Sequence, residues 1–110
     1  MSFTSTQNKG FRMKFENGFA ISVQWGTMNY CQNKNLGAGC NDEMEEKFWK
    51  SASAEIAVYG KNGGMLPIGD GESVIGWLST DDVAKVIEGV ASAESRDEII
   101  KQVKTYKDGK

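Results

Sequence analysis

Apolar and polar residues alternate along two neighbouring stretches near the start of the chain. Alternation with a period of two is typical of a β-strand that buries one face. We therefore predict two adjacent strands, each with one apolar row. The apolar members of these rows are Phe11, Met13 and Phe15 in the first stretch and Phe19, Ile21, Val23 and Trp25 in the second.

The pair Asn17-Gly18 separates these two stretches and predicts a tight turn. A two-residue loop would pair Glu16 with Phe19 and would put the two apolar rows on opposite faces. A three-residue loop instead pairs Phe15 with Phe19 and gives one continuous apolar face. We therefore predict the three-residue loop, with Gly18 in the left-handed conformation at a bulge.

Three further strands are predicted downstream, over 53–59, 65–68 and 73–77. Pro67 restricts the middle one to a sheet edge or a bulge, because proline has no backbone N–H to donate. The acidic segment 41–50 predicts a short helical turn. Residues 1–9 are polar, and we expect them to be frayed.

Two helices are predicted at the end of the chain. Ser79 precedes Asp82 with N-cap spacing, and Ser95 with Glu98 forms a capping box. Strands followed by helices indicate an α+β fold in a single domain, 1–110, with an N-terminal antiparallel β-sheet meander packed with two C-terminal helices. The helical apolar stripes are Val83, Val86, Ile87 and Val90, then Ile99, Ile100, Val103 and Tyr106.

Composition narrows the classes of function that the chain can have. The 110 residues carry a net charge of -2, which provides no basic field for a DNA or RNA polymer. The absence of histidine leaves general-base chemistry at neutral pH to a tuned carboxylate or lysine, so we predict a protein that is not an enzyme. Two cysteines without histidine also predict no metal site.

The N-terminal residues and the hydropathy of the chain lead to an expected cellular location. The polar start predicts no secretory signal, and no apolar run has the length of a membrane span. We therefore expect a cytoplasmic protein in which Cys31 and Cys40 are reduced. A disulfide between them, closing the intervening Gly-Ala-Gly turn, is the alternative.

Aromatic and amide side chains are the first candidates for binding. Trp25 ends an inward row, so it either packs in the core or lines the mouth of a pocket. Asn29 and Tyr30 lie in the amide-rich loop that follows, where amides supply directed donors and acceptors. Trp77 precedes the first helix cap and is either a site or interface residue or a packing residue.

Arg96 is the candidate for binding an anion. It is one of only two arginines and lies in the first turn of the second predicted helix. A cation there opposes the helix dipole unless an anion accompanies it, and the free N–H groups of that turn favour phosphate. Two interpretations remain open, a solvated surface residue paired with Asp97 or Glu94, and a phosphate ligand.

A family resemblance rests on four segments of the chain. These are FENGFAISVQWG, MNYCQNKN, SASAEIAVYGKNG and GESVIGWLSTDDVAKVI. Together they resemble the first-described phage Thoeris anti-defence family over about Phe15–Ile100. Members of that family are small phage proteins that act as sponges for immune signals.

The resemblance implies binding of a glycocyclic ADP-ribose signal without cleavage, in the cytoplasm of the infected host cell and without a cofactor. It also implies a homodimer or hexamer, and binding of CBASS cyclic oligonucleotides at a separate site. The ligand contacts that it implies are Trp77 and Arg96, followed by Trp25, Asn29 and Tyr30. The alternative is a small phage protein-interaction module that inhibits a host protein through the acidic face around Glu43–Glu46.

Overall fold

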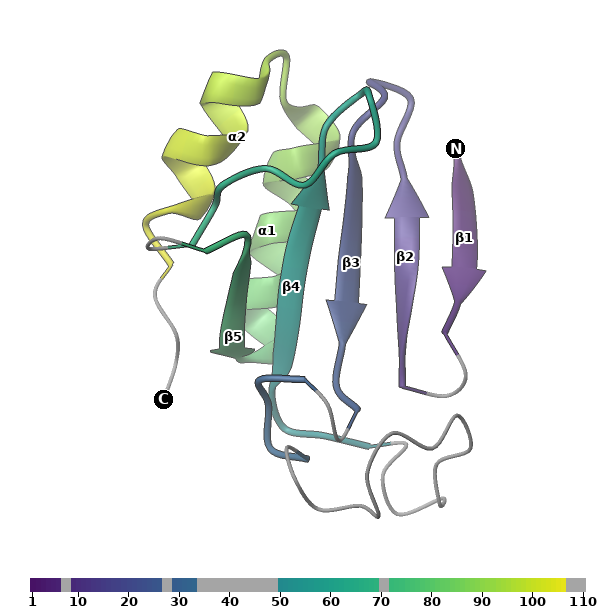
Figure 1. The fold of residues 1–110 in the computed structure, drawn as a ribbon, viewed down its shortest axis with the longest axis vertical. Helices are drawn as coiled ribbons and strands as arrows, with labels where there is room; N and C mark the ends of the chain where they lie inside the picture. The colour runs from purple at the N-terminus through teal and green to yellow at the C-terminus, as the bar shows by residue number, and fades with distance from the viewer. Residues whose placement is uncertain (7–8, 27–28, 34–49, 70–71, 107–110) are drawn as a thin grey trace.

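The computed structural model describes residues 1–6, 9–26, 29–33, 50–69 and 72–106. Five strands come first along the chain, and two helices follow them (Figure 1). The elements are β1 (Ser2–Ser5), β2 (Gly10–Lys14), β3 (Ala20–Gln24), β4 (Ala54–Tyr59), β5 (Val74–Leu78), α1 (Thr80–Ser92) and α2 (Arg96–Val103).

All five strands form one antiparallel sheet in the order β1-β2-β3-β4-β5. Each strand therefore pairs with the next one along the chain, which is a meander. α1 packs across β3 and β4, and α2 packs beside α1. The α+β fold predicted from the sequence, a meander followed by two helices, is confirmed.

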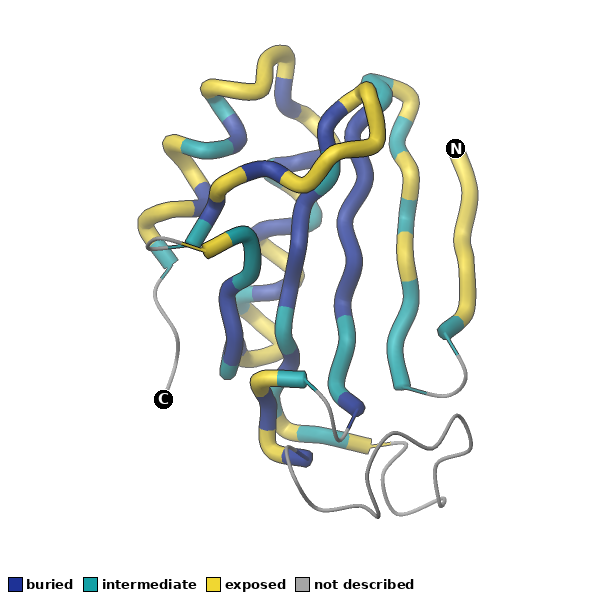
Figure 2. Tube along the Cα trace, viewed as in Figure 1, coloured by how far each residue is buried: buried dark blue, intermediate teal, exposed yellow. Residues whose placement is uncertain are grey.

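The prediction of a frayed start over residues 1–9 is wrong for Ser2–Ser5, which form β1. Phe3 pairs with Met13 and Thr4 with Arg12 of β2. All four residues of β1 are exposed, so this edge strand adds little to the core (Figure 2). Backbone hydrogen bonds hold the strand in place, and the side chains of this segment show no pattern that predicts a strand.

The hairpin between β2 and β3 has the predicted three-residue loop. Met13 pairs with Ile21, and the Phe15 N–H donates to the Phe19 carbonyl at 2.9 Å. Gly18 has a φ of 91°, the left-handed conformation that the bulge requires. One apolar face therefore continues from the first strand to the second.

The downstream strands differ from the prediction in two places. The segment 65–68 forms a single bridge, between Met65 and Tyr59, and no strand. In β5 a bulge sets Gly76 and Trp77 against the single residue Glu55 of β4. The bulge shifts the alternation by one residue, so that its flanking apolar residues, Ile75 and Leu78, are both buried.

Both helices begin at the predicted caps. The Ser79 hydroxyl accepts from the Asp82 N–H at 3.2 Å, and the Ser95 hydroxyl accepts from the Glu98 N–H at 3.2 Å. The Glu98 carboxylate accepts in turn from the Glu94 N–H at 2.9 Å. Each serine therefore satisfies an N–H group that the first helical turn leaves without an intrahelical partner.

The core lies between the helices and one face of the sheet, where β3 and β4 are the most buried strands (Figure 2). On the opposite face, the Arg12 guanidinium stacks over the Tyr59 ring, 4.1 Å from its centroid. Ala20, Ser22 and Ala57 lie between them in the sheet and are buried. A stacked pair of long side chains therefore lies over these small residues, and neither α1 nor α2 packs on that face.

Some predictions lie outside the described residues. They are the helical turn over 41–50, the acidic face around Glu43–Glu46 and any bridge from Cys31 to Cys40. Cys31 itself is buried, and its sulfur donates to the Gly26 carbonyl at 3.4 Å. Among the described residues, no helix has the length and apolar character that crossing a membrane requires.

Candidate functional site

A cavity of about 380 Å³ opens between the sheet and the first half of α1. Its volume is in the range of pockets that hold small organic ligands. The wall is predominantly apolar, and the polar groups are few. The lining residues are Phe11, Val23, Trp25, Lys50, Ser51, Ala52, Ser53, Ala54, Leu78, Thr80, Val83, Ala84 and Ile87.

Two aromatic side chains from neighbouring strands provide the flat surfaces of the cavity. The rings of Phe11 and Trp25 meet edge to face, with centroids 6.1 Å apart and planes at 67°. Trp25 follows β3 directly, and its backbone N–H donates to the Lys9 carbonyl at 2.7 Å. Trp25 packs against the core and also borders the cavity, so both interpretations of this residue from the sequence hold in part.

The polar groups lie in the segment just before β4 and at the start of α1. Lys50 is exposed, and it is the one charged residue among the lining residues that the structure describes. Ser51, Ser53 and Thr80 add hydroxyl groups. Thr80 is the first residue of α1, so the N-terminal end of that helix dipole borders the cavity. An apolar wall with a lysine beside it suits a flat ring that carries an anionic group, and Asp81 and Asp82 in the first turn of α1 offset the attraction of the helix N-terminus.

Asn33 joins the two walls that carry Trp25 and Lys50. Its side chain is 3% exposed, and its amide nitrogen donates to the Trp25 carbonyl at 2.9 Å and to the Lys50 carbonyl at 3.2 Å. Breaking this link would take a donor from two part-buried carbonyl groups. Asn33 therefore holds together the two segments of the cavity wall that carry Trp25 and Lys50.

The other two amides of the loop that the structure describes, Asn29 and Gln32, are also used in internal bonds. The Asn29 amide donates to the Glu55 carboxylate at 3.2 Å, and its oxygen accepts from the Gly26 N–H at 2.9 Å. The Gln32 amide oxygen accepts from the Ala52 N–H at 2.8 Å. Asn29 and Gln32, whose amides the sequence offered as donors and acceptors for a ligand, therefore fasten the loop to β4 and to the segment preceding it.

Tyr30 and Trp77, which are distant in sequence, are brought together by the bulge in β5. The backbone N–H of Trp77 donates to the backbone carbonyl of Tyr30 at 2.8 Å. A Cβ on Gly76 would lie 2.4 Å from the Tyr30 Cβ, so only glycine allows this approach. Trp77 has a φ of 60°, which is uncommon for a bulky residue, and it lies outside the hydrophobic core.

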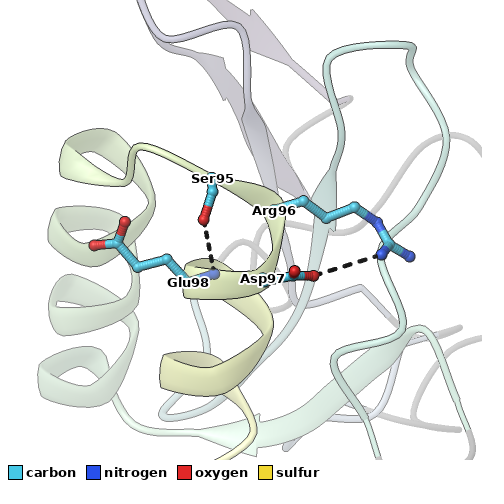
Figure 3. Close-up of polar contacts among 4 residues, drawn as sticks. All are labelled: Ser95, Arg96, Asp97 and Glu98. Carbon is cyan, nitrogen blue, oxygen red and sulfur yellow. Dashed lines mark hydrogen bonds and ion pairs between the residues drawn. The ribbon is translucent and has the colours of Figure 1, made fainter.

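Arg96 lies at the opposite end of α1 from Trp77. The 13 residues of α1 separate the two positions, which is about 20 Å at 1.5 Å per residue. The Arg96 side chain is 58% exposed, and its guanidinium lies 3.9 Å from the Asp97 carboxylate (Figure 3). The structure therefore does not bring Trp77 and Arg96 into one site, and the Arg96–Asp97 pairing matches the solvated interpretation.

Sequence patterns gave no signal for two of the principal groups of this site. Phe11 belonged to an alternating row and was indistinguishable from a core residue, and Lys50 lay among residues with no periodicity. Within the described ranges, no cluster of three acidic or cysteine side chains is placed to hold a metal ion. No family model, curated protein or solved structure matches the chain.

Proposed function

We propose that this protein captures a cyclic nucleotide immune signal, glycocyclic ADP-ribose, and sequesters it without cleaving it. Such capture would block Thoeris in the cytoplasm of the infected host cell. The observation that carries the proposal is the cavity beside α1, where aromatic rings, an apolar wall and a lysine meet. The resemblance to the phage anti-defence family supplies the identity of the ligand.

In this proposal the adenine ring enters the cavity and stacks on Trp25. Aromatic faces bind nucleobases with roughly 1–3 kcal/mol per base. The pyrophosphate stays at the entrance beside Lys50, whose ammonium attracts negative charge, and beside the hydroxyl of Thr80. Asp81 and Asp82 in the first turn of α1 oppose an anion there, so the attraction comes from the lysine. Arg96 lies outside this cavity and has no part in the capture.

The homodimer or hexamer, and a separate site for CBASS cyclic oligonucleotides, are proposed from the resemblance alone. The exposed aromatic ring of Phe3, at 81%, favours an interface at the β1 edge. The same observation supports the rival hypothesis of a module that inhibits a host protein. A stoichiometric host protein recovered without nucleotide would favour that rival.

Calorimetric titration with glycocyclic ADP-ribose tests the proposal. Trp25→Leu should weaken binding roughly tenfold or more because it removes the stacking surface. Trp77→Leu is the matched control, because it removes the same ring outside the cavity, and it should bind like the wild type. Lys50→Ala should weaken binding, whereas Lys101→Ala, an exposed lysine of α2, should not.

Chromatography of ligand released by heating completes the test. Intact ligand is expected, since sequestration requires no bond to break. Absence of binding by the wild type, or equal affinity of Trp25→Leu and wild type, would overturn the proposal. Cleaved ligand would replace it with a hydrolase.

A further inference from the structure

Two turns of the protein share one backbone geometry and one dipeptide, Asn17-Gly18 and Asn62-Gly63. In both, the residue before the loop donates its N–H to the carbonyl of the residue after the loop, at 2.9 Å in the first turn and 2.8 Å in the second. The glycines have φ values of 91° and 87°. Each asparagine oxygen accepts from the N–H two residues on, at 3.1 and 3.0 Å.

The two turns differ in what the asparagine nitrogen contacts. The Asn17 amide nitrogen donates to three carbonyl oxygens at the end of α1, those of Val90, Ala91 and Ala93, at 2.8, 3.3 and 3.0 Å. Asn62 is exposed, and among the described residues no acceptor takes its side-chain N–H groups. The same turn therefore anchors a helix in one place and faces solvent in the other.

Asparagine followed by glycine is the sequence in which the side-chain amide is lost most readily, since glycine leaves the backbone nitrogen unhindered. That nitrogen attacks the side-chain Cγ, its proton passes to solvent, and the departing amide nitrogen takes up a proton and leaves as ammonia. The resulting succinimide ring is opened by water to aspartate or isoaspartate. The reaction needs no oxidant and no reactant other than water.

The attack requires the asparagine side chain to turn away from its native contacts. Asn17 must release four hydrogen bonds to do so, and Asn62 only one. We propose that Asn62 is the deamidation site of the folded protein and that the contact with α1 shields Asn17. Deamidation at Asn17 requires local opening, and it then puts a carboxylate against three carbonyl oxygens at the negative end of the helix dipole.

Peptide mapping by mass spectrometry, on wild-type protein held in mildly alkaline buffer, tests this proposal. In the folded protein, Asn17 should deamidate at least about tenfold more slowly than Asn62, because it reacts only through local opening. In denaturant the two sites should react at similar rates, since both precede glycine. Equal rates in the folded protein would overturn the shielding of Asn17.

Two variants test the consequence. Asn17→Asp should lower the urea midpoint of unfolding well below that of the wild type, whereas Asn62→Asp should leave it nearly unchanged. An unchanged midpoint for Asn17→Asp would overturn the anchoring role. The kinetic comparison uses wild-type protein, so it decides the shielding even if Asn17→Asp does not fold.

Discussion

The two ends of α1 are held in different ways. At the N-terminal end, Ser79 caps the helix from the adjacent sequence, and Thr80 and Val83 border the cavity. At the C-terminal end, the cap comes from Asn17 in the β2–β3 hairpin, 73 residues before Val90. The N-terminal end is thus capped by a residue next to it in sequence and borders the cavity, whereas the C-terminal end is capped by a side chain of the sheet.

The proposed ligand site and the contact that anchors the helix to the sheet therefore lie at opposite ends of α1. The end of α1 has no glycine after it and no basic residue in its last turn. Its local bonds come from the Ser92 hydroxyl, which donates to the Glu88 and Gly89 carbonyls, and from the Ala93 N–H, which donates to the Val90 carbonyl at 3.3 Å. The hairpin supplies a donor there and ties the helix to the sheet. The proposed ligand site lies at the other end, where the described contacts leave a cavity.

The largest expected effect comes from breaking the anchored end. Asn17→Ala should lower the free energy of unfolding by about 2 kcal/mol, because part-buried carbonyl groups at the end of α1 lose the side-chain donor that ties them to the hairpin. Asn62→Ala is the matched control, since it loses the same turn bond and no helix contact. Urea denaturation followed by circular dichroism measures both, and equal losses would contradict the anchoring role.

A smaller effect is expected at the locally capped end. Ser79→Ala should cost about 1 kcal/mol, because the Asp82 N–H loses its acceptor. Ser79→Asp should restore most of the loss, since a carboxylate also accepts at an N-cap. Thermal unfolding of the three proteins decides this, and a melting temperature unaffected by Ser79→Ala would show that the cap contributes nothing.

The smallest effect is expected at Arg96. Because the Arg96 side chain is solvated and its ion pair with Asp97 is 3.9 Å long, Arg96→Ala should change stability by less than about 0.5 kcal/mol. Affinity for glycocyclic ADP-ribose should also be unchanged, since Arg96 lies at the far end of α1 from the cavity. Weaker capture in calorimetry would move the proposed site toward α2.

Local rules predicted the parts of the fold that local chemistry decides. Gly18 and the continuity of the apolar rows led to the hairpin register, and Ser79 and Ser95 marked both helix starts. β1 was missed because its exposed side chains give no alternating pattern, and its pairing with β2 rests on backbone hydrogen bonds. The bulge at Gly76 was missed because Tyr30, which requires it, lies far away in sequence.

The candidate site was less accessible to prediction than the fold. Trp25 was identified as a residue that could line a pocket, but its neighbour Phe11 and the lysine at position 50 were not. Asn29 was predicted as a ligand contact, yet the structure uses its amide to bond Gly26 of the loop and Glu55 of β4. An amide in a sequence does not reveal whether its partner will be a ligand or the chain itself.

The sequence by itself determined the β2–β3 hairpin, the turn at Gly18 and the two serine caps, because each depends on residues within a few positions. Only the tertiary structure decided the role of Asn17, the meeting of Tyr30 with Trp77 and the place of the cavity. Each of these joins segments that are far apart along the chain. Their geometry is set by how the sheet and α1 pack, and the pattern of apolar and polar residues along the chain does not predict that packing.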